Sequence, residues 1–250
     1  MAGVEQALAM AEIALSVPTF IALRFLTAPY GRHARRGWGP SVTARLGWLL
    51  MESPAPVVFA VVYATGARRL DPAPLAFLLM WEIHYVHRAF VYPLRIGRRA
   101  TRMPAGVVLM AIGFNVLNGF LNARWVSSVE VYAPGWLAGP RFAIGAALFV
   151  AGLALNVKSD GALRRLRAPA EDGYRIPRGG AFEWVSCPNY LGEIVEWTGW
   201  AVATWSLAGL AFAVYTAANL APRALAHHAW YRARFPDYPR RRRALIPLIL

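Results

Sequence analysis

The sequence predicts an all-α, multi-pass membrane protein with seven transmembrane helices, its N-terminus outside and its C-terminus in the cytoplasm. Composition is the first observation behind this: of 250 residues, 57% are hydrophobic and 16% are charged, whereas about a quarter of a soluble domain is charged. The second is that apolar stretches recur along the chain, most of them close to the roughly 20 residues that a membrane-crossing helix needs. The third is that basic residues lie between these stretches, as in the loops of membrane proteins.

Composition also excludes several classes of protein. The 27 basic and 13 acidic residues give a formal charge of +14. We expect no nucleic-acid partner all the same, because so apolar a chain lacks the wettable surface of a soluble nucleic-acid binder. The single cysteine, Cys187, rules out a disulfide framework and a multi-cysteine zinc site. Lys158 is the only lysine, which indicates a GC-rich, bacterial gene and therefore a bacterial inner membrane as the location.

The expected spans follow the apolar stretches in order. The first runs from Ala7 to Leu26, and its acids Glu5 and Glu12 indicate a retained helix rather than a signal peptide. The next four are Trp48–Thr65, Pro72–Leu94, Pro104–Leu121 and Phe142–Val157. The stretch Tyr190–Ala226 is too long for one span, so we expect two helices with a break near Ser206–Gly209.

The basic residues support this count. With the N-terminus outside, the inner loops and tail hold most of them: Arg32, Arg35, Arg36, Arg45, Arg95, Arg98, Arg99, Arg102, Lys158, Arg164, Arg165, Arg167, Arg175, Arg178, Arg232, Arg234 and Arg240 to Arg243. The outer loops hold Arg68, Arg69, Arg124 and Arg141. This asymmetry favours an odd number of spans and a cytoplasmic C-terminus.

Glu52 lies inside the second expected span, at membrane depth, where polar groups are costly and mark function. It follows Met51 in the second span. Desolvation disfavours the charged form of a carboxyl, so we expect Glu52 to be partly or wholly protonated and able to donate a hydrogen bond to a carbonyl oxygen. The alternative is a carboxylate near the interface that pairs with Arg45.

The third span carries a polar and aromatic stripe. Its members lie at i, i+4, i+7 and i+11, on one helical face: Trp81, Tyr85, Arg88 and Tyr92. Such a stripe suggests a pocket for an anionic or carbonyl ligand, and the alternative is an aromatic belt with a snorkelling arginine. A metal site at His84 and His87 is not expected, because carboxylate partners are few and no HExxH motif is present.

Three further stripes lie near the cytoplasmic ends of the later spans. They are Asn156, Asp160, Arg164 and Arg167; Asn189, Glu193, Glu196 and Trp200; and Arg223, His227 and Tyr231. Each alone could be a buried structural network. Together they offer guanidinium groups, amides and aromatic faces, which suit a cofactor with phosphates and rings. Gly179–Gly180 is no GxGxxG motif, so a Rossmann site is not expected.

Several separated motifs occur in an order typical of one family. They are H-Y-V-H-R-A-F-V-Y (84–92), N-V-K-S-D (156–160), L-R-A-P (166–169), Y-R-I-P-R-G-G-A-F (174–182), N-Y-L-G-E-I-V-E-W (189–197), A-T-W-S-L (203–207) and the final H-H-A-W-Y…F-P-D-Y-P…R-A-L-I-P. The chain therefore resembles the steroid 5α-reductases, most densely from residue 156 onward. This resemblance implies a seven-helix membrane enzyme that uses NADPH.

The resemblance also implies roles for single residues. Glu52 and Tyr85 match the pair that contacts the substrate carbonyl. The positions that match the cofactor site are Arg88, Arg99, Asn156, Asp160, Arg167, Tyr174, Arg175, Asn189, Glu193, Arg223, His227 and Tyr231, with Arg98 as an alternative to Arg99. Met51 stands where the family often has Gln, which bears on steroid specificity.

The implied reaction is reduction of the C4–C5 double bond of a 3-oxo-Δ4 steroid, or a similar apolar enone, that enters from the bilayer lipids. We expect one integral membrane domain over residues 1–250, with the carbonyl pair in 1–130 and most of the cofactor site in 140–250. One alternative is an isoprenylcysteine-type methyltransferase that uses S-adenosylmethionine, since Pro188–Glu193 fits its helix start loosely. A scaffold or transporter is a second alternative. The sequence predicts no oligomeric state.

Overall fold

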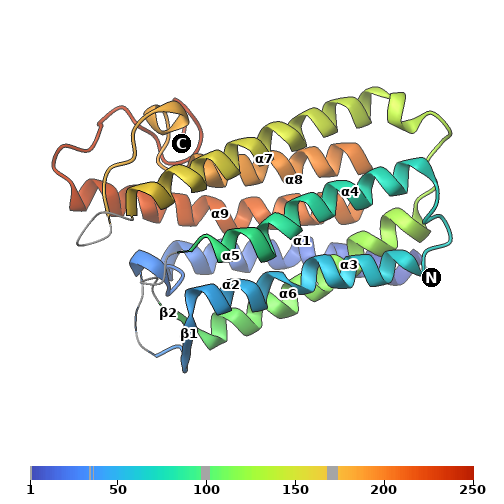
Figure 1. The fold of residues 1–250 in the computed structure, drawn as a ribbon, viewed down its shortest axis with the longest axis horizontal. Coiled ribbons are helices and arrows are strands. Elements are labelled where there is room, and N and C mark those ends of the chain that lie inside the picture. Colours follow the sequence, from blue (N-terminus) through green and yellow to red (C-terminus); the bar gives the residue numbers. More distant parts are fainter. Residues whose placement is uncertain (1, 34, 36, 97–101, 168–173) are drawn as a thin grey trace. The chain divides into compact units, whose positions relative to one another are not determined.

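The computed structural model describes residues 2–33, 35, 37–96, 102–167 and 174–250. Its α-helices are α1 (Ala2–Phe25), α2 (Ala44–Glu52), α3 (Pro54–Ala64), α4 (Pro72–Val86), α5 (Tyr92–Leu94), α6 (Ala105–Arg124), α7 (Pro140–Arg167), α8 (Pro188–Thr204) and α9 (Leu207–Arg234) (Figure 1). Two π-helical turns, His87–Val91 and Trp125–Val129, extend α4 and α6. Short 3-10 turns lie at Gly31–His33, Trp136–Ala138 and Gly180–Glu183. The strands are β1 (Ser41–Thr43) and β2 (Arg102–Pro104).

The helical class is confirmed, and each expected span falls on a helical stretch. Within the described residues, four segments are long and apolar enough to cross a membrane: Gly3–Phe25, Ala44–Ala64, Ala105–Val129 and Pro140–Leu166. The stretch from Pro72 to Leu94 is interrupted by a π-helical turn, and α8 has 17 residues. The chain is therefore a helical protein of membrane type.

The chain divides into two compact units, and each is described by itself. The first comprises Met1–Ala11, Ala28–Ala143 and Thr204–Gly209. The second comprises Glu12–Thr27, Ile144–Ala203 and Leu210–Leu250.

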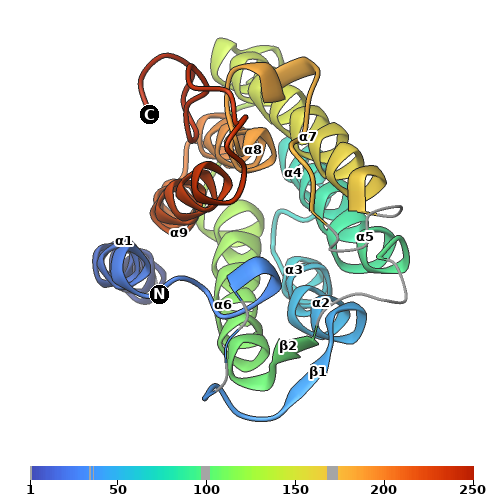
Figure 2. The same cartoon turned by 90° about the vertical axis from the view of Figure 1, so that its left-hand side faces the viewer.

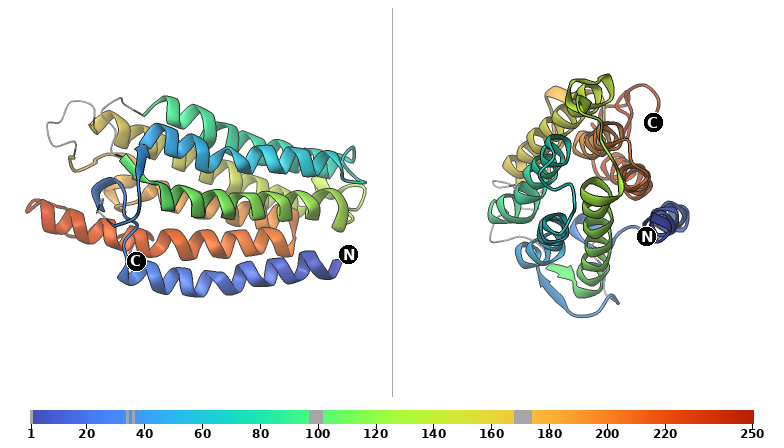
Figure 3. Two further views of the ribbon diagram at one scale, coloured as in Figure 1. Left: turned by 90° about the horizontal axis from the view of Figure 1, so that it is seen from below. Right: turned by 90° about the vertical axis from the view of Figure 1, so that its right-hand side faces the viewer.

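In the first unit, α2 and α3 form one interrupted rod. The Ser53 N–H still donates to the Leu49 carbonyl (3.1 Å), and Pro54 then begins α3, where its missing N–H costs nothing. Helix α6 packs along both halves of this rod (Figure 3). Gly119 permits the close approach, because a Cβ there would lie 3.1 Å from the Ala55 carbonyl oxygen.

The two strands of the first unit lie directly before α2 and α6 in the chain. β1 and β2 are antiparallel, with Val42 opposite Met103. Thr43 leaves β1 and caps α2, its Oγ1 accepting a hydrogen bond from the Leu46 N–H (3.4 Å). The acid Glu5 pairs through its Oε1 with Arg124 at 3.0 Å, inside the same unit.

In the second unit, four glycines bring α7 and α8 together. Gly145 and Gly152 on α7, and Gly192 and Gly199 on α8, each stand against the backbone of the other helix, where a Cβ would collide with it. Both pairs are seven residues apart, so they form one small-residue stripe on each helix. Figure 2 shows α8 and α9 of this unit nearly end-on, with α7 seen obliquely beside α8.

The expected break between the last two helices is confirmed. Helix α8 ends at Thr204 and α9 begins at Leu207. Trp205 has a positive φ of 47°, and the Ser206 Oγ accepts a hydrogen bond from the Gly209 N–H (2.9 Å) as a helix cap.

Candidate active site

Glu52 lies at the end of α2, held by two other elements of the first unit. The Asn115 amide of α6 donates to its Oε2 (3.3 Å) and to the Met51 carbonyl (2.5 Å). The Arg88 Nε lies 3.9 Å from its Oε1. The alternative partner Arg45 donates elsewhere, to the Pro93, Leu94 and Ile96 carbonyls, so the interfacial pairing of Glu52 with Arg45 was wrong.

The stripe of the third span faces this carboxyl. Three contacts join it, in antiparallel order, to the rod of α2 and α3. They are Trp81 Nε1 to the Ala55 carbonyl (3.2 Å), Arg88 Nε to Glu52 Oε1 (3.9 Å) and the Tyr92 ring to the Trp48 ring (centroids 5.2 Å apart). Tyr85 lies between Trp81 and Arg88 on the same face. It is buried, with its ring 4.8 Å from that of Trp81, so it belongs to the surface that meets the α2–α3 junction.

Arg88 is held by aromatic rings as well as by the acid. Its guanidinium lies 4.6 Å from the Trp48 ring centre and 5.1 Å from that of Tyr92. Cation–π contacts of this kind stabilise a desolvated arginine. Arg88 also lies in the π-helical turn His87–Val91, and π turns inside helices recur at functional sites.

Met51 has an apolar role. Its side chain is buried in a cluster with Met103 and Val108. Its carbonyl, rather than its side chain, is what Asn115 binds. Asn115 was not among the predicted site residues, and its signal was an amide that lies, with Asn118, inside the expected span Pro104–Leu121.

A second polar network joins α7 and α8. The Asn156 amide donates to the Asn189 carbonyl (3.0 Å) and to Glu193 Oε2 (3.2 Å). The Asn189 amide donates to Asp160 Oδ1 (3.0 Å). Two of the predicted stripes are thus brought together, directly beyond the glycine Gly152, which sets the helix spacing.

A third cluster joins α8 and α9. The Arg223 Nη2 donates to the Tyr190 hydroxyl (3.2 Å), which also shares a hydrogen bond with His227 Nε2 (3.1 Å). Asn219 fixes the other end of the Arg223 guanidinium at 3.0 Å. Tyr190 was not singled out as a site residue; it lies next to Asn189 but points to the other neighbouring helix.

The remaining aromatic residues gather at the end of α9. The Tyr174 ring packs against Trp230 (5.0 Å), and Tyr231 stacks on Tyr238 of the tail (5.3 Å). Arg175 is exposed. Burial raises the pKa of the Tyr238 phenol above its usual range, so its hydroxyl stays protonated and can share a hydrogen bond with Ser186 (2.7 Å).

Two predicted residues cannot be placed by their side chains. Arg99, like its alternative Arg98, lies outside the described residues. Arg167 is the last residue of α7, and its side chain is outside the description.

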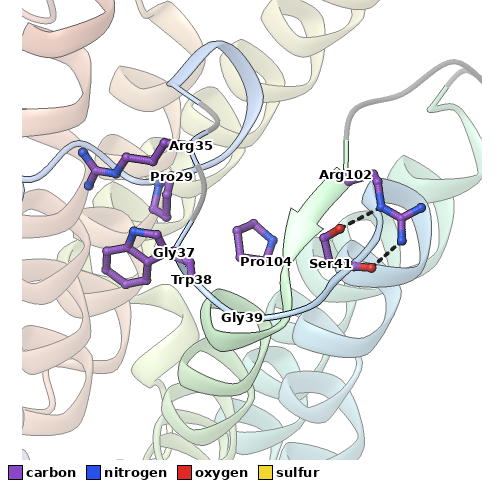
Figure 4. A pocket seen from close by; sticks show the side chains of 8 residues that line it. All are labelled: Pro29, Arg35, Gly37, Trp38, Gly39, Ser41, Arg102 and Pro104. Carbon is purple, nitrogen blue, oxygen red and sulfur yellow. Dashed lines mark hydrogen bonds between the residues drawn. The ribbon is translucent and has the colours of Figure 1, made fainter.

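A shallow cavity of about 360 Å³ lies elsewhere in the first unit (Figure 4). Its lining residues are Pro29, Arg35, Gly37, Trp38, Gly39, Ser41, Arg102 and Pro104. Arg102 turns to Ser41, donating to its Oγ at 2.7 Å and to its carbonyl at 2.5 Å. The cavity contains no predicted site residue.

Comparison with known proteins identifies the family. A family model described as 3-oxo-5-alpha-steroid 4-dehydrogenase matches residues 101–250. The steroid 5-alpha-reductase DET2 of Gossypium hirsutum is 47% identical over 240 residues, 94% of this chain and 93% of that protein. The 3-oxo-5-alpha-steroid 4-dehydrogenase 1 of Bos taurus is 43% identical over 248 residues, 98% and 96% of the two chains. The chain belongs to the 3-oxo-5-alpha-steroid 4-dehydrogenase family.

Membership in the steroid 5-alpha-reductase family confirms the resemblance found in the motifs. It makes the chain an oxidoreductase of steroid metabolism with the apolar helices of a membrane protein. It also decides against the methyltransferase and scaffold alternatives.

Proposed function

We propose that the protein reduces the C4–C5 double bond of a 3-oxo-Δ4 steroid, or a similar apolar enone, with NADPH. The observation that carries the proposal lies in the first unit. Trp81 contacts Ala55 and Arg88 contacts Glu52, and Tyr85 lies between these two residues on the same face of the helix. The relatives supply the reaction class, because this chain aligns over nearly its whole length with proteins named for steroid 5-alpha reduction.

Glu52 and Tyr85 bind the carbonyl oxygen of the enone in this proposal. Asn115 donates to Glu52 Oε2, so that oxygen is an acceptor. We place the proton of a neutral Glu52 on Oε1, the oxygen that faces Arg88 Nε at 3.9 Å. Oε1 and the Tyr85 hydroxyl can both donate to the oxygen on which negative charge grows during reduction. Such preorganised donors contribute roughly 3–4 kcal/mol each to transition-state stabilisation.

The second unit supplies the groups for the cofactor. Its amides, the Tyr190 hydroxyl and the Arg223 guanidinium suit ribose hydroxyls and phosphate oxygens, and its aromatic rings suit a base. The residues proposed to hold NADPH are Asn156, Asp160, Arg167, Tyr174, Arg175, Asn189, Glu193, Arg223, His227 and Tyr231, with Arg88 and Arg99 of the first unit. When bound, NADPH supplies the hydride for the β-carbon of the enone.

The membrane arrangement is part of the proposal. Seven spans with the N-terminus outside follow from the distribution of arginines, and four apolar helices support a membrane location. An apolar steroid partitions into the bilayer, so we propose that it enters from the lipid. The bacterial inner membrane stays a prediction from composition.

The direct test is turnover. Purified protein in detergent is incubated with NADPH and testosterone or progesterone, and the products are separated by mass and retention. The 5α-reduced steroid is the expected product. Binding of S-adenosylmethionine without NADPH-dependent reduction of any 3-oxo-Δ4 steroid would refute the proposal.

A further inference from the structure

The tail after α9 folds back onto the segment that precedes α8. Val185 and Arg243 form a parallel bridge. The Arg243 N–H donates to the Trp184 carbonyl (2.9 Å), and the Ser186 N–H donates to the Arg243 carbonyl (2.8 Å). Backbone pairing therefore fixes the tail against the loop of residues 174–187.

Arg242 lies inside this junction and is 2% exposed. Its Nη1 donates to the Pro177 carbonyl (3.0 Å) and lies 3.5 Å from the Tyr238 hydroxyl, while its guanidinium faces the Tyr238 ring at 5.0 Å. Among the residues that the structure describes, its Nε and Nη2 have no hydrogen-bond partner, and no carboxylate lies within 4.0 Å of it.

A buried guanidinium without a counter-ion is costly, so a tail that needed only packing would be better served by an apolar side chain. The contacts that Arg242 does make connect the loop to the tail. Pro177 belongs to the loop, and Tyr238 belongs to the tail. Tyr238 in turn stacks on Tyr231 and shares a hydrogen bond with Ser186, which also bonds His228 Nδ1 (2.6 Å).

The loop that Arg242 grips carries two of the residues proposed for the cofactor. Pro177 is two residues after Arg175 and three after Tyr174, and Tyr174 packs against Trp230 of α9. Losing the bond to Pro177 would remove the buried connection between this loop and the tail and leave the exposed Arg178–Asp237 ion pair (3.8 Å). The buried positive charge also favours an anionic ligand bound nearby.

We infer that Arg242 is a positioning residue for the nucleotide: it touches no substrate, and it holds the 174–178 loop in the conformation that binds the cofactor. This rests on the proposed use of NADPH. The loss of a hydrogen bond to a charged group predicts that Arg242→Gln raises the KM for NADPH about 10-fold to 100-fold, while kcat at saturating NADPH stays near the wild-type value. Arg242→Lys keeps the charge and one donor, so its KM should lie between the two.

The test compares these variants with Arg241→Gln and Arg241→Lys, which remove or keep a charge at the exposed neighbouring position. NADPH and steroid KM values and kcat are measured on the full-length protein in detergent. Limited trypsinolysis then reports the loop directly, because Arg175 and Arg178 are exposed cleavage sites within it. Faster cleavage after these two residues is expected in the Arg242 variants, with wild-type cleavage in the Arg241 variants.

The outcomes separate the two claims. A wild-type protein that does not bind NADPH refutes the proposed cofactor. A wild-type protein that binds NADPH, with Arg242 variants matching their Arg241 controls in NADPH KM and loop cleavage, overturns the positioning role alone. An equal rise in the KM for steroid and NADPH also overturns it. If Arg242→Gln does not fold, the Arg242→Lys and Arg241→Lys pair decides.

Discussion

The two units build their polar sites in opposite ways. Around Glu52, large side chains fill the space between α2, α4 and α6, and polar groups are few and individually anchored: one amide, one guanidinium under aromatic rings, one buried phenol. Between α7 and α8, glycines bring the backbones together, and an amide–acid network continues beyond them. The first arrangement suits an apolar molecule with one carbonyl, and the second suits a ligand rich in hydroxyls and phosphates.

Removal of the two carbonyl donors in the first unit should have the largest effect on activity. Glu52→Ala and Tyr85→Phe should each lower kcat by about 10²-fold to 10³-fold, because a preorganised donor at the developing oxyanion is lost. NADPH affinity should change much less than kcat, since most of the residues proposed for the nucleotide lie in the other unit. Product formation and nucleotide binding are measured side by side, and normal turnover in either variant would remove that residue from the reaction.

A larger side chain at the glycine contact between α7 and α8 should destabilise the second unit. Gly152→Leu puts a side chain where even a Cβ meets the backbone of Glu196, so we expect a loss of roughly 1–3 kcal/mol or more and a clear drop in Tm. Gly161→Ala on the same helix is the control, because its Cβ would meet only the ends of Arg165 and Arg164 side chains at 3.5 and 4.0 Å. Equal Tm values for the two variants would show that the close approach of α7 and α8 is not required.

Substitutions at two asparagines test the comparison, because each should change a different kinetic parameter. Asn115→Leu frees Glu52 Oε2 and should lower kcat about 10-fold, while Asn156→Leu should raise the KM for NADPH by a similar factor. Asn122→Leu serves as a control, because its buried amide bonds Asn118 instead. If Asn115→Leu raised the KM for NADPH and left kcat unchanged, the division of roles would be wrong.

The smallest expected effect is at Met51. Met51→Gln places an amide in the cluster with Met103 and Val108, which should cost about 1 kcal/mol of stability. It should also change the ratio of kcat/KM between two 3-oxo steroids by only a few-fold. Competition between testosterone and progesterone measures this ratio, and a change above about 10-fold would give residue 51 a direct part in specificity.

Sequence periodicity captured the helices and the polar stripes well, because both repeat with the turn of a helix. The break after Thr204 and the face formed by Trp81, Arg88 and Tyr92 were predictable on that ground. The partner of Glu52 could not be predicted on that ground. Arg45 is nearer in sequence, but Asn115 lies on α6, which packs against α2. The contact of Arg242 with Pro177 spans 65 positions, which no local pattern reveals.

The π-helical turn at His87–Val91 has one further consequence. The Tyr92 N–H reaches back five residues to the His87 carbonyl, so this turn holds one residue more than an ordinary helical turn. A turn with one extra residue absorbs that residue locally, so the residues on either side keep the alignment of an uninterrupted helix. Deleting one residue from His87–Val91 would restore an ordinary α-helical turn and could leave Tyr92 against Trp48. Deleting one residue from the regular part of α4 would instead rotate every residue beyond it by about 100°. A single deletion is therefore better tolerated in this short stretch than in Pro72–Val86.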